Sequence, residues 1–361
     1  MVVKNVFKNL IQKNMKNIIK VNFLILILLS IYSCQNEDNE FSDYKYTTIY
    51  FPYQTPIRTL VLGDYDQIDN TKDNKLQFSI GVTMGGVYAN NKDRKVNYVL
   101  DETLTNKLYY VEGKDTVRIN ALPQAYYTLS PAGTMTIPKE KMYGFIDVQL
   151  SDAFLNDTNT YKNRYAIPLL LTGSESDSIL RGKTVFSDID RRVAAGWDIV
   201  PKDYTLFMIK YINPYHGKFL YRGKDVVTNS SGTKIDEVIY RNKYLEKNII
   251  LSLQTTSRNK VEFTSIVRRT SGSSGNFKAS IDFNSTDNTC IVSTANGSAF
   301  DVVGSGKFIR EGEEWGDKKR NTIILDYKIT DSTKGETHQV NDTLVIRDRA
   351  VVLETFNAII K

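Results

Sequence analysis

A strict alternation of apolar and polar residues in the second half of the chain limits its fold more than any other feature. Residues 276–283, NFKASIDF, and residues 321–330, NTIILDYKIT, carry an apolar side chain at every second position. This period is that of a β-strand, whose successive side chains point to opposite faces. Turn clusters such as SSGT, SGSSGN and STANGS separate runs of this kind. The pattern predicts eight or nine consecutive antiparallel strands between His216 and Arg349, with no convincing helix.

Evenly spaced strands with short turns favour an antiparallel β-barrel, which removes the exposed sheet edges by closure. An open sandwich of two sheets is the alternative, because it produces the same alternation on each strand.

The first half of the chain shows shorter strand signals with proline-containing connections. Strand-like runs include RTLVLGD, LQFSIGVTM, GFIDVQL and RYAIPLLLT, and all eight prolines lie at or before Pro214. Several short strands with turns between them predict an immunoglobulin-like β-sandwich. SDAFLND has the features of a short helix with Ser151 or Asp152 as its N-cap.

These patterns define five segments, and the class they predict is all-β. We expect a signal peptide over 1–33, an acidic tether over 34–45, the sandwich domain over 46–171, an interdomain segment over 172–211 and the barrel domain over 212–361.

The amino-terminal residues have the features of a secretory signal. Five lysines are followed by the apolar run VNFLILILLSIYS, which is shorter than a membrane-spanning helix of ~20 apolar residues. Ser33 directly before Cys34 resembles the lipobox of bacterial lipoproteins, although Ile31 stands where leucine is commoner. We expect lipid on Cys34; a plain secreted protein or a retained anchor are the alternatives. The acidic run QNEDNE resembles the tag of surface-displayed lipoproteins, which places the protein on the extracellular side of the outer membrane.

Removal of residues 1–33 changes the charge balance. The formal net charge of +6 includes five lysines of that segment, so the remaining chain has 42 basic and 41 acidic residues. Near-neutrality argues against a nucleic-acid partner. Only Cys290 remains besides Cys34, which excludes an intrachain disulfide framework, and we expect Cys290 to be a buried structural residue.

Residues suited to catalysis or metal binding are few. His216 and His338 are the only histidines, and neither has the spacing of a metal ligand; we expect His216 to pack at the domain junction and His338 to be exposed. The acidic stretch DYDQIDNTKDNK lacks the glycine and the final glutamate of a calcium loop. The sequence therefore predicts no enzyme activity, no cofactor and no metal site.

Two aromatic segments are candidate binding platforms. REGEEWGD places Trp315 next to Glu313 in a polar loop, and AYYTLSP carries Tyr126 and Tyr127. Aromatic faces stack on the C–H-rich faces of sugar rings, while nearby carboxylates and amides bind the hydroxyls. The alternative for Trp315 is packing back onto the barrel rim.

Longer phrases resemble a family of Bacteroidetes surface lipoproteins. They include YFPYQTPIRTLVLGD, VTMGGVYANNKDRKVNYVLD and PKDYTLFMIKYINPYHGKFLYRGKD, and the resemblance covers most of residues 46–225. It implies an N-terminal sandwich domain of unknown function and a lipocalin-like C-terminal barrel. Such proteins are found beside starch-utilisation-type glycan uptake systems, and the family supplies no agreed catalytic residues.

The resemblance and the residues together predict a non-catalytic, lipid-anchored protein that binds glycan at the cell surface. By implication it captures oligo- or polysaccharide for a neighbouring outer-membrane transporter complex and contacts the membrane through its lipid alone. The alternative is a structural or adhesion subunit that docks on a partner protein and has no small ligand.

Overall fold

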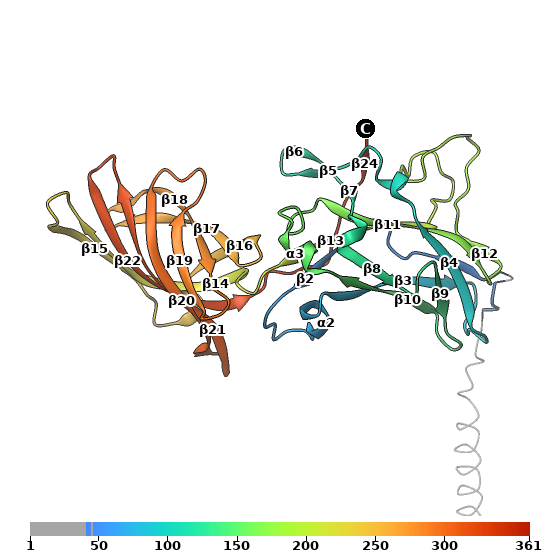
Figure 1. Ribbon diagram of the computed structural model, residues 1–361, viewed down its shortest axis with the longest axis horizontal. Helices are drawn as coiled ribbons and strands as arrows, with labels where there is room; N and C mark the ends of the chain where they lie inside the picture. Colours follow the sequence, from blue (N-terminus) through green and yellow to red (C-terminus); the bar gives the residue numbers. More distant parts are fainter. Residues whose placement is uncertain (1–40, 45) are drawn as a thin grey trace, which may run out of the picture. The chain divides into compact units, whose positions relative to one another are not determined.

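The computed structural model describes residues 41–44 and 46–361, and all of its strands lie in the compact unit Lys45–Lys361. Residues 1–40, with the expected signal peptide, Cys34 and most of the tether, lie outside the described part. The chain is all-β, as the sequence predicts (Figure 1). The short helical segments are α2 (Thr71–Asn74), α3 (Asp152–Asn156), η1 (Glu102–Thr105), η2 (Gln124–Tyr126) and η3 (Leu245–Lys247). The predicted helix in SDAFLND is thus confirmed as α3.

The N-terminal part is a β-sandwich with a small third sheet. Its five-stranded sheet has the order β12 (Ser178–Ile179), β1 (Thr48–Tyr50), β3 (Gln77–Gly85), β10 (Tyr143–Leu150) and β8 (Tyr127–Ser130). The seven-stranded sheet has the order β23 (Glu354–Thr355), β2 (Pro56–Val61), β13 (Tyr204–Ile212), β11 (Tyr165–Ser174), β4 (Arg94–Leu100) and β9 (Thr134–Ile137), with β7 (Asn120–Ala121) also on β11. The third sheet is β24 (Ile359–Ile360), β5 (Leu108–Glu112) and β6 (Asp115–Arg118).

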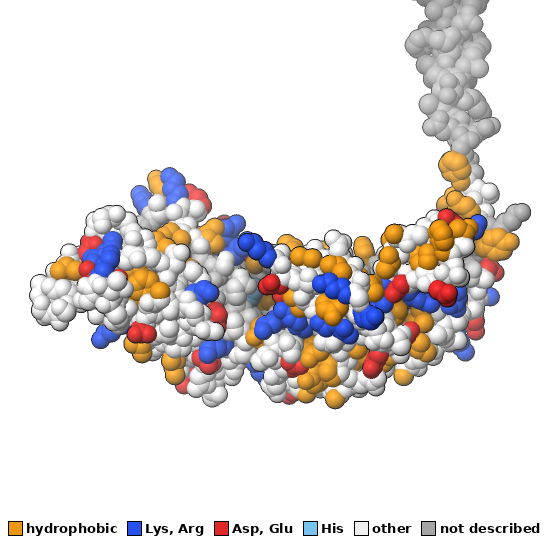
Figure 2. All heavy atoms as spheres, turned by 90° about the horizontal axis from the view of Figure 1, so that it is seen from above, with side chains coloured by type: hydrophobic (Ala, Val, Ile, Leu, Met, Phe, Trp, Pro, Cys, Tyr) orange, Lys and Arg blue, Asp and Glu red, His pale blue; other side chains and the backbone are white. Residues whose placement is uncertain are grey.

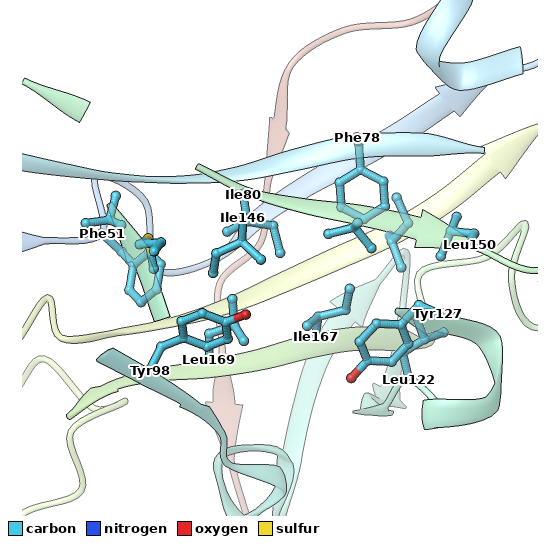
Figure 3. Close-up of a cluster of buried hydrophobic side chains, with 14 of the residues drawn as sticks. Phe51, Phe78, Ile80, Tyr98, Leu122, Tyr127, Ile146, Leu150, Ile167 and Leu169 are labelled. Carbon is cyan, nitrogen blue, oxygen red and sulfur yellow. The ribbon is translucent and has the colours of Figure 1, made fainter. Parts of the chain in front are cut away.

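The sandwich core forms where the inward sides of the two larger sheets meet. Strands β3 and β10 contribute Phe78 and Ile146, which face Ile167 and Leu169 of β11 across the layer (Figure 3). Burial of each such side chain stabilises the fold by about 1.5–3 kcal/mol. The outward positions of β3 and β10 alternate with these and remain partly or fully exposed.

The C-terminal part is a closed antiparallel barrel. The sheet contains β14 (Gly217–Thr228), β15 (Lys234–Tyr240), β16 (Ile249–Ser257), β17 (Lys260–Arg269), β18 (Gly272–Phe283), β19 (Thr289–Thr294), β20 (Asp301–Trp315), β21 (Lys318–Asp331) and β22 (Glu336–Asp348). Strand β22 pairs with β14 along its length, from Lys218↔Asp348 to Thr228↔Thr337, so eight strands close a ring. Strand β15 extends the wall beside the second half of β14. The barrel is therefore confirmed, and the open sandwich is not formed.

Much of the predicted interdomain segment 172–211 belongs to the sandwich instead. Strand β13 lies between β2 and β11 and is buried on both faces. One face packs into the main sandwich core through Ile209 and Tyr211, and the other packs Leu206 and Met208 against the third sheet. A strand buried on both sides has a continuous apolar run rather than an alternation, which made it difficult to recognise.

The predicted barrel domain 212–361 is also too long at its end. After β22 the chain returns to the sandwich, where β23 pairs with β2 and β24 pairs with β5 (Figure 1). Phe356 is buried between these strands and lies edge-on to Tyr110, with ring centroids 6.4 Å apart. The sandwich is therefore discontinuous in sequence, and the barrel lies within its chain.

Candidate functional site

Trp315 ends strand β20 on a hairpin of the barrel and is partly packed back onto the wall. Its indole Nε1 donates to the Ile346 carbonyl oxygen at 3.2 Å, and the Arg320 guanidinium lies 4.4 Å from the ring centroid. Glu313 forms an ion pair with Arg222 at 2.6 Å. The two residues predicted as a site thus lie near each other, but Glu313 is engaged within the barrel.

A cavity of about 640 Å³ nevertheless lies beside Trp315. Its lining includes Leu220, Ile250, Glu246, Glu314, Trp315 and Arg347. Arg320, which contacts the indole ring, does not line this cavity. The site therefore combines a fixed aromatic ring with carboxylates and a guanidinium.

Tyr126 and Tyr127 are less accessible than the sequence suggested. Tyr126 lies edge-on to Tyr165 and donates to Asp157 Oδ2 at 3.3 Å. Tyr127 belongs to the sandwich core, and burial raises the pKa of its hydroxyl to about 12. It also lines a cavity of about 410 Å³ together with Tyr98 and Leu129. The two tyrosines therefore point into different surroundings and do not form one platform.

The outer face of the five-stranded sheet carries a better exposed aromatic group. Tyr143 and Phe145 of β10 are 50% and 51% exposed, and their ring centroids lie 5.3 Å apart. Phe145 pairs with Gly81 of β3, where an added Cβ would lie 3.1 Å from the phenyl ring. Glycine therefore lets the ring lie close against the sheet, with its other side toward solvent.

Tyr50 of β1 extends this aromatic group across the sheet. Tyr50 and Tyr143 both pair with Thr83 of β3, one from each side. The Tyr50 ring lies over Gly85, 3.6 Å from where a Cβ would be, and Lys202 Nζ lies 5.7 Å from its centroid. Two aromatic rings on β10 and one on β1 thus lie on the same face of the sheet, on either side of β3.

Polar side chains continue the same face along β3 and β10. Ser79 donates to Asp147 at 2.7 Å, and Gln77 donates to Gln149 at 2.7 Å. We call the following set the outer face: Thr48, Tyr50, Gln77, Ser79, Gly81, Thr83, Gly85, Thr128, Ser130, Tyr143, Phe145, Asp147, Gln149 and Ser178. Asp147 is its one acidic residue, and it contains no lysine or arginine.

The sequence contained a signal for this face that the alternation argument did not use. In YGFIDVQL the buried positions are Gly144, Ile146, Val148 and Leu150, so the aromatic residues Tyr143 and Phe145 occupy the side expected to be polar. Two neighbouring aromatic residues on the solvent side of one strand depart from that pattern and make this face a candidate binding surface. The glycines of β3 that accommodate the rings could not be recognised without the strand register.

The barrel interior contains a polar cluster that the sequence did not predict. Asp342 of β22 is buried and accepts hydrogen bonds from the hydroxyls of Tyr221, at 2.9 Å, Tyr327, at 2.6 Å, and Tyr240. The Arg268 guanidinium lies 3.9 Å from the Tyr240 ring centroid. Burial raises the pKa of the Asp342 carboxyl to about 6, although the three hydroxyl donors and Arg268 oppose this shift.

His338 is buried, so the expectation that it is exposed is wrong. Its Nδ1 lies 3.0 Å from both carboxylate oxygens of Asp225, on the neighbouring strand β14. His338 occupies an inward position of β22, two residues from Val340 and four from Asp342, so the strand period places it in the barrel. A buried partner 113 residues away made this position favourable for a polar side chain.

The other two residues considered in the sequence are structural. His216 accepts a hydrogen bond from the Thr255 backbone N–H at 3.0 Å, and burial lowers its pKa to about 4, so the imidazole is neutral at pH 7. Cys290 is confirmed as a buried free thiol, and burial raises its pKa to about 12. In the described part of the chain, no group of three or more metal-binding side chains lies close enough together to hold an ion.

Comparisons with known proteins agree with this architecture. Residues 214–350 match a family model described as a domain of unknown function, DUF5627, and residues 44–178 match a second model described as an N-terminal domain. A crystal structure of a protein of unknown function from Bacteroides ovatus is 33% identical in sequence, with a TM-score of 0.80. That match covers 89% of this chain and 100% of the other. No curated protein matches the chain.

The fold defines a two-domain all-β protein in which a sandwich carries a closed barrel. The chain belongs to the same family as the Bacteroides ovatus protein, a Bacteroidetes family of unknown function. Among the described residues, no helix is both long and apolar enough to span a membrane.

Proposed function

We propose that the protein is a non-catalytic glycan-binding lipoprotein that captures oligo- or polysaccharide at the cell surface. The observation that carries this proposal is the presence of three aromatic rings on the outer face, the neighbouring pair Tyr143 and Phe145 of β10 and Tyr50 across β3 from them. Sugar rings present C–H faces that stack on aromatic side chains and hydroxyls that need donors and acceptors. The outer face supplies both within one sheet.

The chemistry of this face suits a neutral, extended ligand. Rings that lie against the sheet make a shallow surface, along which a chain of sugar units can contact several rings at once. The pairs Ser79–Asp147 and Gln77–Gln149 lie further along the same strands and provide hydroxyl, carboxylate and amide groups for the sugar hydroxyls. Their present mutual hydrogen bonds keep these side chains ordered before a ligand arrives, which reduces the entropy cost of binding.

The affinity of a single contact is modest. Covering ~100 Å² of aromatic surface contributes about 2.5 kcal/mol before the costs of association are subtracted. Repeated sugar units and several protein copies on one surface would raise the effective affinity without new contacts.

The near-balance of charge supports a neutral ligand. Basic and acidic side chains both occur on the side of the molecule shown in Figure 2, together with hydrophobic ones. The outer face itself contributes a single carboxylate, from Asp147.

The direct test is binding of residues 35–361 to a panel of soluble polysaccharides by affinity electrophoresis and calorimetry. We expect one glycan class to retard the protein, and the double variant Tyr143→Ala with Phe145→Ala to lose that retardation. Tyr244→Ala removes a similarly exposed aromatic residue on the barrel and serves as the matched control. If only the Trp315→Ala variant lost this retardation, the glycan site would be assigned to the barrel instead. If no glycan across a broad panel binds, the glycan proposal fails and the structural or adhesion subunit remains.

The membrane anchor is a separate part of the proposal. It is supported by the sequence around Cys34 and by the Bacteroides origin of the similar structure, and it implies an outer-membrane location next to a glycan transporter complex. Metabolic labelling with a fatty-acid analogue should modify the wild-type protein but not Cys34→Ser. An unlabelled wild-type protein would contradict the anchor and leave the binding proposal intact.

A further inference from the structure

We propose that the cavity beside Trp315 is a second saccharide site, one that takes a short saccharide of one or two sugar units. This inference rests on the proposed function, because both sites would serve the same class of ligand. The inference goes beyond the proposed function because it assigns a separate site, with a different shape, to the barrel.

The volume of the cavity suits a small ligand. At about 640 Å³ it lies in the ~300–1,000 Å³ range of small-molecule sites. The outer face has no wall among the residues that form it, whereas this cavity is lined by residues of strands β14, β16, β20 and β22 and of η3. A space of this volume accommodates one or two sugar units.

The aromatic wall of the cavity is already fixed. The hydrogen bond from Trp315 Nε1 to the Ile346 carbonyl and the contact with Arg320 hold the indole in one orientation. A fixed ring loses little conformational entropy when a sugar stacks on it. Leu220 and Ile250 add aliphatic surface for the C–H groups of the ligand.

The polar wall supplies groups that lack other strong partners. Among the described residues, neither Glu246 nor Glu314 forms an ion pair or a side-chain hydrogen bond, and Lys319, opposite Glu314 in the hairpin, does not line the cavity. In the described part of the chain, the one ion pair of Arg347 is with the neighbouring Asp348, at 3.5 Å. The carboxylates can accept hydrogen bonds from sugar hydroxyls, and the guanidinium can donate hydrogen bonds to sugar hydroxyls. A hydroxyl can therefore act both as a donor and as an acceptor in this cavity. This combination distinguishes the cavity from a purely apolar or a purely acidic pocket.

Intrinsic fluorescence gives a direct readout, because the chain has only two tryptophans. In a Trp197→Phe background Trp315 is the one indole that emits. The probes are neutral di- and trisaccharides of glucose, galactose, mannose and xylose. We expect at least one to change the emission of Trp315 with a dissociation constant of about 0.1–5 mM, the range of small neutral ligands with few contacts.

Variants of the polar wall test the assignment without removing the indole. Glu246→Gln, Glu314→Gln and Arg347→Ala should each weaken binding about tenfold or more, as expected for loss of a hydrogen bond to a charged group. Glu311→Gln alters the same hairpin outside the cavity and should leave binding unchanged. Trp315→Phe keeps a ring but lacks the N–H and the reporting indole, so its binding is measured by calorimetry and should be weaker than that of wild type.

The two proposed sites can fail independently. The double variant Tyr143→Ala with Phe145→Ala should lose polysaccharide retention but keep the response of Trp315 to short saccharides. The second site is overturned if none of the probes changes Trp315 emission, or if the Glu246, Glu314 and Arg347 variants bind as well as wild type. Loss of polysaccharide retention alone, with short-saccharide binding intact, would bear only on the outer face.

Discussion

The Tyr327 hydroxyl donates to Asp342 Oδ2 at 2.6 Å between two neighbouring strands, and both residues are buried inside the barrel. Burial raises the pKa of the Asp342 carboxyl to about 6. The folded barrel therefore holds a proton on Asp342 at a pH at which an exposed aspartate, with a pKa near ~3.9, has released it.

This difference predicts how stability depends on pH. Between about pH 4 and pH 6 the folded state binds more protons than the unfolded state. The contribution of protonated Asp342 to the free energy of unfolding is therefore fully present below pH 4 and is lost as the pH rises through 6. Asp342→Asn removes the titrating group. The stability advantage of wild type over the variant should thus shrink by on the order of 2–3 kcal/mol between pH 4 and pH 7. Urea unfolding across this range measures it; a constant difference would contradict the prediction, and the exposed Asp301→Asn is the control.

Removal of one hydroxyl from the cluster should also destabilise the barrel. Tyr327→Phe leaves Asp342 with two tyrosine donors in place of three, and we expect the free energy of unfolding to fall by about 1–3 kcal/mol. Tyr143→Phe removes an exposed hydroxyl and should change stability by less than about 0.5 kcal/mol. Chemical denaturation of both variants provides the comparison, and equal effects would argue against the cluster as a stabilising element.

Gly223 gives the cluster its space. A Cβ at this position would lie 2.2 Å from Asp342 Oδ1 and 2.8 Å from the Tyr240 hydroxyl. Gly223→Ala should therefore destabilise the protein by about 2–4 kcal/mol, since the carboxylate and the hydroxyl cannot both keep their positions. Gly85→Ala, where the nearest atom would be 3.6 Å away, is the matched substitution in another strand. Similar thermal midpoints for Gly223→Ala and wild type would show that the cluster can rearrange.

The returning tail should stabilise the sandwich. Phe356 is 6% exposed, and Phe356→Ala should lower the free energy of unfolding by about 3–5 kcal/mol through loss of buried area and creation of a cavity. Leu353, three residues earlier, is 85% exposed, so Leu353→Ala should have little effect. Differential scanning calorimetry distinguishes the two, and a neutral Phe356→Ala variant would mean that the tail is dispensable.

Gly81 tests whether the orientation of the aromatic ring matters for glycan binding. Gly81→Val would push the Phe145 ring away from the sheet while keeping all three aromatic residues of the outer face. We expect polysaccharide affinity to fall about 5- to 10-fold, equivalent to ~1–1.4 kcal/mol, with the fold retained. Circular dichroism checks the fold and calorimetry the affinity. Unchanged affinity would indicate that the rings bind without lying against β3.

Much of the barrel follows from the sequence, because its strands alternate regularly. The inward residues predicted for 276–283, Phe277, Ala279, Ile281 and Phe283, are all buried. Ser280 is an exception: it lies on the opposite face of the strand from these four residues, yet it is buried, and its hydroxyl lies 2.9 Å from that of Ser293.

Other parts depend on partners that are distant in sequence. Asp342 and His338 occupy inward positions of β22, although polar residues are expected to face outward. Their burial can be predicted only when Tyr221 is known to bind Asp342 and Asp225 to bind His338. The outer face likewise needs the register of β1, β3 and β10, which join residues as far apart as Tyr50 and Tyr143. Trp315 could be put forward as a candidate from sequence alone, since a tryptophan in a polar loop is conspicuous without any knowledge of strand pairing.

The return of the chain from the barrel to the sandwich also sets an order of events during synthesis. Strand β2, near residue 56, lacks its neighbour β23 until the ribosome has added residue 355, and the core around Tyr110 lacks Phe356 until one residue later. The complete sequence of the barrel strands has been made by then. The inserted domain is therefore available to fold before the domain that surrounds it, and a chain that terminates ten residues early would carry an intact barrel on an unfinished sandwich.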